Sequence, residues 1–139
     1  GLSAATYSVY SSATLTATLG QPDGASKLCL SCHDGTIAID TFGGNTGTHI
    51  MDNTNGDLVG TDISNDHPVS FVYDAALATA DGGLFSPESA SFVDAGHNVP
   101  LFAGKMQCSS CHQVHDDTNG KFLRMSNAGS APSLTCNNK

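Results

Sequence analysis

The chain has 139 residues, of which 39% are hydrophobic and only 6% aromatic, with no tryptophan. This length suits one domain, and the shortage of large apolar side chains predicts a small core that needs reinforcement. The 13 Asp and Glu residues outnumber the five Lys and Arg residues, giving a formal net charge of −8. This charge argues against nucleic acid and anionic lipid as partners. No apolar stretch approaches the roughly 20 residues of a membrane-spanning helix.

The N-terminal part of the chain predicts a strand, a turn and a helix in that order. In residues 6–19, leucine and alanine alternate with threonine near the end of the segment, which is the two-residue period of a strand. Two glycines and a proline in residues 20–26 predict a turn. Residues 25–33 are expected to form one or two helical turns.

The rest of the chain predicts loops with a few short elements, because Gly, Asn, Thr and Asp are frequent and hydrophobic periodicity is weak. The expected elements are a loop over 34–66, a strand within 68–72, short helices over 73–80 and 87–93, a helix over 105–115, and a loop over 116–139 with one turn near 121–124. The sequence therefore predicts a mostly irregular fold with a few short helices and little β-structure, below the usual content of regular structure.

Two pentapeptides, CLSCH at 29–33 and CSSCH at 108–112, have the spacing C-x-x-C-H. This is the attachment signature of c-type haem: the cysteines form thioethers with the two vinyl groups of one porphyrin, and the histidine binds the iron. The predicted attachment residues are Cys29, Cys32, His33, Cys108, Cys111 and His112.

The alternatives to haem are a disulfide within each cysteine pair, or one zinc site that uses all four thiolates. Neither explains why a histidine directly follows both pairs. We therefore predict a haem-cored domain over residues 27–139, preceded by an N-terminal arm over residues 1–26. Because thioether attachment of haem takes place outside the cytoplasm, the motifs also predict a periplasmic or extracellular protein.

Four further histidines, His49, His67, His97 and His115, are available as second axial ligands. Their number favours bis-histidine ligation over methionine. On a helix, the rings of His112 and His115 would face the same side, so His115 would serve a different haem and bring two haems close together. His67 is also favoured because Pro68 biases its backbone away from helix.

The fifth cysteine, Cys136, lies in the segment SLTCN at 133–137. Compared with C-x-x-C-H, the first cysteine is replaced by Ser133 and the histidine by Asn137. Three explanations stay open: a third haem has been lost and Cys136 is a free or intermolecular thiol; a haem persists through one thioether and a borrowed ligand; or the sequence is imperfect at this end.

Several segments together resemble the doubled C-x-x-C-H group of multihaem c-type cytochromes from metal-reducing and related bacteria. They are LCLSCHDGT at 28–36, NDHPVSF at 65–71, MQCSSCHQVH at 106–115, FLR at 122–124 and the altered SLTCNNK at 133–139. The resemblance implies low-potential bis-histidine haems in a chain with little secondary structure, with His67 and His115 as distal ligands. It also implies that some similar proteins form cell-surface filaments in which a histidine of one subunit ligates a haem of the next.

These observations predict electron transfer to other redox proteins or extracellular electron acceptors, and no catalysis, because two ligands per iron leave no open coordination position. The alternative is a haem enzyme with an open distal site that reduces a small oxyanion or peroxide, although five Lys and Arg residues provide little charge to attract an anion. A third hypothesis is a conductive filament in which the strand within 6–19 pairs with a neighbouring subunit. The alternative is that this strand pairs within its own domain.

Overall fold

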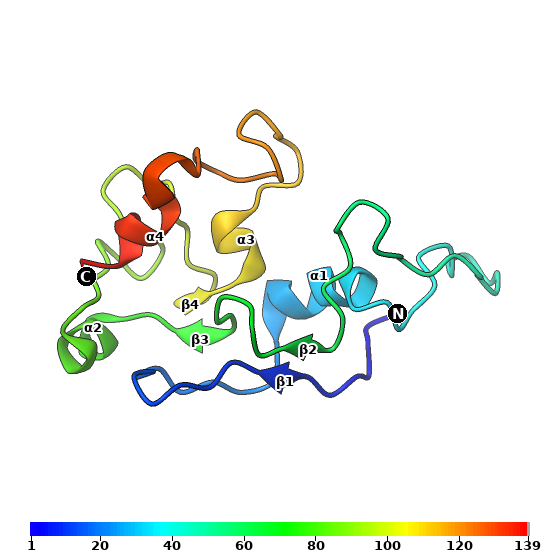
Figure 1. The fold of residues 1–139 in the computed structure, drawn as a ribbon, viewed down its shortest axis with the longest axis horizontal. Coiled ribbons are helices and arrows are strands. Elements are labelled where there is room, and N and C mark those ends of the chain that lie inside the picture. Colours follow the sequence, from blue (N-terminus) through cyan, green and yellow to red (C-terminus); the bar gives the residue numbers. More distant parts are fainter. Residues whose placement is uncertain (139) are drawn as a thin grey trace.

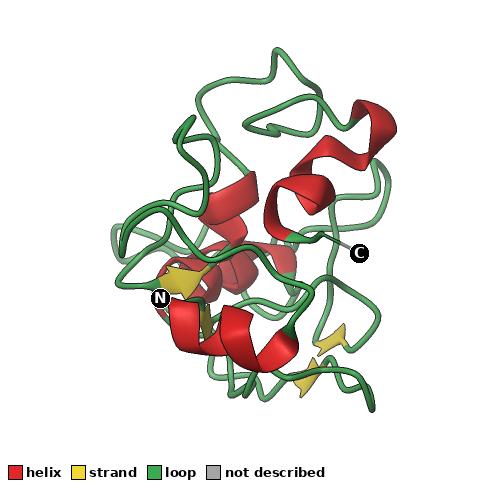
Figure 2. Ribbon diagram, turned by 90° about the vertical axis from the view of Figure 1, so that its left-hand side faces the viewer, coloured by secondary structure: helices red, strands yellow, loops and turns green. Residues whose placement is uncertain are grey.

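The computed structural model describes residues 1–138, and loops make up most of them (Figures 1 and 2). The helices are α1 (Gly24–His33), α2 (Ala75–Asp81), α3 (Cys108–Cys111) and α4 (Ala131–Cys136), with a 3₁₀ turn, η1, at Ala128–Ser130. The strands are β1 (Ser8–Val9), β2 (Asp62–Ile63), β3 (Phe71–Val72) and β4 (Lys105–Met106). The pair β1–β2 is parallel and the pair β3–β4 is antiparallel. The prediction of a mostly irregular chain with short helices and little β-structure is confirmed.

The buried apolar side chains form two small clusters. The larger contains Phe71, Tyr73, Val93, Val99, Leu101, Met106 and Cys136. The smaller contains Tyr7, Leu30 and Ile63. Other large apolar side chains lie at the surface, with Phe42 70% and Val114 68% exposed. The chain by itself therefore covers only part of its apolar surface, as its composition predicts.

Local signals account for the elements that the sequence predicts correctly. The helix expected over 25–33 is α1, the helix expected over 73–80 is α2, and β3 lies within 68–72. Helix α2 begins after Asp74, whose Oδ1 accepts a hydrogen bond of 2.8 Å from the Leu77 amide. It ends at Gly82, whose φ of 68° is the left-handed conformation that glycine adopts without steric cost.

The prediction of a strand through residues 6–19 is wrong beyond Ser8–Val9. The Gln21 side chain replaces a strand partner at Tyr7: its Oε1 accepts from the Tyr7 amide at 2.7 Å, and its Nε2 donates to the Tyr7 carbonyl at 2.9 Å. Strand β1 pairs with β2 of the same chain. The pairing that a filament would need at this strand is thus made internally over these residues.

The helix predicted over 87–93 is also wrong, since this segment folds back on itself in isolated bridges. The Ser89 and Phe92 backbones bond to each other, and the Val93 amide donates to the Val99 carbonyl at 2.9 Å. Asp94 then accepts bonds from the amides of Asn98 and Val99. Its carboxylate thus closes a turn. Short polar side chains that bond to nearby backbone in this way compete with helical hydrogen bonds, which explains why the segment is not a helix.

In the segment 105–115 only α3 is helical, and the loop expected over 116–139 contains α4. His112 lies after the last residue of α3 in an extended conformation, with φ −109° and ψ 140°. The helical spacing of His112 and His115 is therefore wrong, and their rings do not share a helix face. No described helix is long and apolar enough to cross a membrane.

Candidate functional site

The two helices that carry the C-x-x-C-H motifs pack against each other, and α1, α3 and α4 follow one another across the molecule (Figure 1). Ser26 of α1 is completely buried. Its Oγ accepts a hydrogen bond of 2.9 Å from the Cys108 amide at the start of α3. The small side chain of Ser26 thus allows the backbones of the two motifs to approach closely.

Gln107, which directly precedes the second motif, is 3% exposed and connects α1 and α3 with Ser70, the residue before β3. Its Oε1 accepts hydrogen bonds from the Ser26 amide at 3.0 Å and the Ser70 hydroxyl at 3.1 Å. Its Nε2 donates to Asp23 Oδ1 at 3.0 Å, just before α1 begins. Because the polar atoms of this buried amide are satisfied, the network holds the two motifs in a defined relative position.

Asp23 also forms an ion pair with Lys105 of β4. The hydrogen bond from Lys105, followed by that from Gln107, lowers the pKa of the Asp23 carboxyl below its ordinary value. This interaction stabilises the folded state fully above about pH 4, the ordinary range of an aspartate in the unfolded chain. The stabilisation is lost as the pH falls through the lowered pKa.

Replacing Asp23 with asparagine is therefore expected to lower the free energy of unfolding by about 0.5 kcal/mol near pH 7, since the pair is partly exposed. The difference between variant and native protein should shrink as the pH falls through the lowered pKa of Asp23. Chemical denaturation at several pH values measures this difference. Asp66→Asn, which removes the same charge from an exposed loop, is the control, and an equal pH dependence in both variants would contradict the interpretation.

The first cysteines of the two motifs lie close together. The interaction between the thiols of Cys29 and Cys108 raises the pKa of Cys29 and lowers that of Cys108. All five cysteines are free. Within residues 1–138, no group of three or more His, Cys, Asp or Glu side chains is arranged to hold a metal ion.

The two motif histidines share one orientation. The Nδ1–H of His33 donates to the Asp57 carbonyl at 2.8 Å, and that of His112 donates to the Lys121 carbonyl at 2.8 Å. A bond at Nδ1 leaves the lone pair on Nε2, which is how iron- and zinc-ligating histidines are held. Both motif imidazoles therefore keep Nε2 as the ring nitrogen that could bind a metal.

The other four histidines divide into two pairs. His67 donates from Nδ1 to the Pro68 carbonyl at 2.9 Å, and His49 donates to Asp40 Oδ2 at 2.8 Å. The bond from His49 is the main reason that the pKa of Asp40 falls to about 2. His97 stacks on Phe92, with ring centroids 4.2 Å apart. His115 lies in an exposed turn that its amide anchors to Gln113 Oε1. The bonds at Nδ1, which sequence spacing does not reveal, leave the Nε2 lone pairs of His49 and His67 available.

A partly exposed apolar residue is bonded through the backbone to each motif or to the residue that follows it. Val59, 41% exposed, donates from its amide to the His33 carbonyl, and Phe122, 45% exposed, accepts from the Gln113 amide next to His112. Each motif is thus hydrogen-bonded, at its histidine or at the residue after it, to a segment that carries a partly exposed apolar residue.

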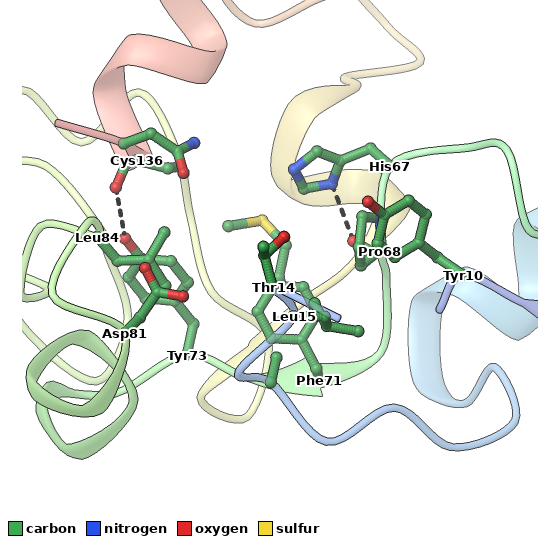
Figure 3. Close-up of a pocket in the computed structure, with 13 residues that line it drawn as sticks. Tyr10, Thr14, Leu15, His67, Pro68, Phe71, Tyr73, Asp81, Leu84 and Cys136 are labelled. Carbon is green, nitrogen blue, oxygen red and sulfur yellow. Dashed lines mark hydrogen bonds between the residues drawn. The ribbon is translucent and has the colours of Figure 1, made fainter. Parts of the chain in front are cut away.

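Cys136 differs from the motif cysteines. It is 7% exposed and belongs to the larger apolar cluster, and burial is the main cause that raises the pKa of its thiol to about 12. It also lines a cavity of about 250 Å³, which His67 reaches from the other side (Figure 3). The structure therefore brings Cys136 and His67 to one cavity, although they are 69 positions apart.

Comparison with known proteins gives no match to a family model and none to a curated protein. The function has to be inferred from the residues of the site.

Proposed function

We propose that this chain is a small haem-cored cytochrome that transfers electrons through covalently bound c-type haems. Cys29 and Cys32 would anchor one haem and Cys108 and Cys111 the other, with His33 and His112 as the first axial ligands. The observation that carries the proposal is the combination of two C-x-x-C-H motifs whose histidines both present Nε2, on helices α1 and α3 that pack together through Ser26 and Gln107.

When bound, the haems supply reversible one-electron chemistry at iron. The chain's part is to position them. Packing of α1 against α3 brings the two attachment motifs together, which favours rapid electron exchange. The carbonyls of Asp57 and Lys121 fix the ring orientation of the two motif histidines. A net charge of −8 favours the oxidised state and therefore a low reduction potential.

The second axial ligands are drawn from His49, His67, His97 and His115. Bis-histidine ligation leaves no position for a substrate, so we propose an electron carrier rather than an enzyme. Its partners would be other redox proteins or extracellular electron acceptors, in the periplasm or at the cell surface. The negative charge suits a basic partner surface, which it would attract by electrostatic steering.

Native mass spectrometry tests the proposal because it counts haems and subunits together. At least two covalent haems per chain are expected, and both motif haems should be low-spin in the ferric state. The spin state is best measured in Cys136→Ser, because this variant keeps both motifs and removes any contribution from a haem attached to Cys136. A colourless protein, or a high-spin signal that persists in this variant, would contradict the proposal.

Assembly into a filament with haem ligation between subunits is a separate proposal, which rests on the resemblance to multihaem cytochromes. His49 is the histidine that suits it, since its side chain is 79% exposed and Asp40 holds its ring. Sedimentation of the native protein is expected to show polymers if this is correct. A strictly monomeric protein would exclude it.

A further inference from the structure

The C-terminal helix α4 repeats the backbone geometry of the second haem motif. At the end of α3 the His112 amide donates to the Cys108 carbonyl at 3.0 Å, and at the end of α4 the Asn137 amide donates to the Ser133 carbonyl at 2.9 Å. The residue after each helix is extended, with φ and ψ of −109° and 140° at His112 and of −114° and 141° at Asn137. Asn137 thus occupies the position that the ligand histidine has in the second motif.

The segments that follow the two helices are also paired in the same way. Residues 111–113 form an antiparallel bridge with 122–124, and residues 136–138 form one with 83–85. Each bridge has two backbone hydrogen bonds of between 2.7 and 3.0 Å, one accepted by the motif's last cysteine and one donated two residues later. The second site therefore reproduces the supporting frame as well as the helix.

The side chains of this copy are changed at two of the three attachment positions. Ser133 replaces the first cysteine, while Cys136 keeps the second. The Asn137 side chain donates from Nδ2 back to the Ser133 carbonyl at 3.0 Å, so its amide is held at the helix end. An asparagine amide is a poor ligand for haem iron, and one axial position at this site would lack a protein ligand.

The cavity next to α4 contains a histidine, the residue type that the altered motif lacks at its own last position. Besides Cys136 and Asn137, apolar and aromatic side chains line it, among them Leu15, Phe71 and Tyr73. His67 lies across the cavity from Cys136 (Figure 3). Because its Nδ1 is bonded to the Pro68 carbonyl, its Nε2 is the ring nitrogen left to bind iron.

We propose that this cavity holds a third haem, anchored by one thioether to Cys136 and ligated by His67 as its single imidazole. The cavity volume of about 250 Å³ is below that of sites that enclose a whole ligand, so part of the haem would protrude. Attachment adds the Cys136 S–H across one vinyl group: a C–S bond forms, the S–H and vinyl π bonds break, and the proton goes to the other vinyl carbon. No oxidant is consumed.

This inference rests on the proposed function and extends it. The two motif haems would have both axial positions filled and would transfer electrons. The third haem would have one open axial position that binds a small ligand. His49, His97 and His115 remain as second ligands of the two motif haems. The three anchoring sites would follow one another in the order α1, α3, α4 (Figure 1).

Denaturing mass spectrometry of the native protein tests the proposal without depending on activity. Three covalent haems are expected, and two in Cys136→Ser. In the reduced native protein, about one haem in three should bind carbon monoxide, and none in Cys136→Ser. Asn137→His, which restores the motif histidine, should keep three haems and lose carbon monoxide binding, and it provides a second readout if Cys136→Ser folds poorly.

The outcomes separate the two proposals. Two covalent haems in the native chain would overturn the third site and leave the electron-transfer proposal intact. A third haem that acidified acetone extracts would overturn the role of Cys136 as its anchor. A native chain that carries no covalent haem at all would overturn both the third site and the electron-transfer proposal. If His67→Ala leaves the absorption spectrum of the carbon-monoxide-binding haem unchanged, His67 is not its ligand.

Discussion

Replacing both Cys108 and Cys111 with alanine is expected to remove one haem and to destabilise the whole protein. The apolar clusters of the chain are small, and exposed side chains such as Phe122 lie beside this motif. If a haem covers even about 100 Å² of this apolar surface, its loss costs about 2.5 kcal/mol. For a domain of this size, the midpoint of thermal unfolding should fall by roughly 10 °C. Calorimetry and a haem count by mass spectrometry measure the two effects.

Ser109→Ala is the matched control because it changes the same motif without touching an attachment residue. In the part of the chain that the structure describes, Ser109 Oγ is buried and has no hydrogen-bond partner. Removing such a hydroxyl is expected to be neutral or slightly stabilising. If the double cysteine variant keeps its full haem content and stability, the second motif does not hold a haem.

The parts of the fold that the sequence predicts correctly depend on neighbouring residues. Helix α2 follows from an Asp at its start and a Gly after its end, and the C-x-x-C-H spacing is a signal within five residues. A strand is different, because it needs a partner elsewhere in the chain. The alternation near Leu15 resembles a strand, but the Leu15 amide donates to the Ser12 carbonyl at 3.2 Å and so closes a turn.

The relations between distant residues could not be predicted from the sequence. Gln107 and Ser26 are 81 positions apart, and nothing in either local sequence indicates their contact. The same holds for His67 and Cys136. His115 shows the opposite error: its spacing from His112 suggests one helix face, but α3 ends at Cys111 because the next residue joins a bridge with Leu123.

Replacing Gln107 with alanine is expected to separate the two motifs as well as to destabilise the fold. The Ser26 amide would lose its acceptor in a completely buried position, and the Ser70 hydroxyl and Asp23 would lose a partner each. Buried groups without partners cost about 1–3 kcal/mol each, so we expect a loss of about 3 kcal/mol in the free energy of unfolding. Denaturant unfolding measures this loss.

The same substitution should weaken electronic coupling between the two motif haems, because Gln107 directly precedes Cys108 and holds it against α1 near Cys29. Magnetic interaction between the ferric irons, measured by electron paramagnetic resonance, should decrease while the haem count stays the same. Gln113→Ala is the control, since Gln113 Oε1 accepts its bond from the His115 amide in an exposed turn, and its effect should stay within about 0.5 kcal/mol. An unchanged magnetic interaction in a destabilised Gln107→Ala would mean that this network supports the fold without setting the distance between the haems.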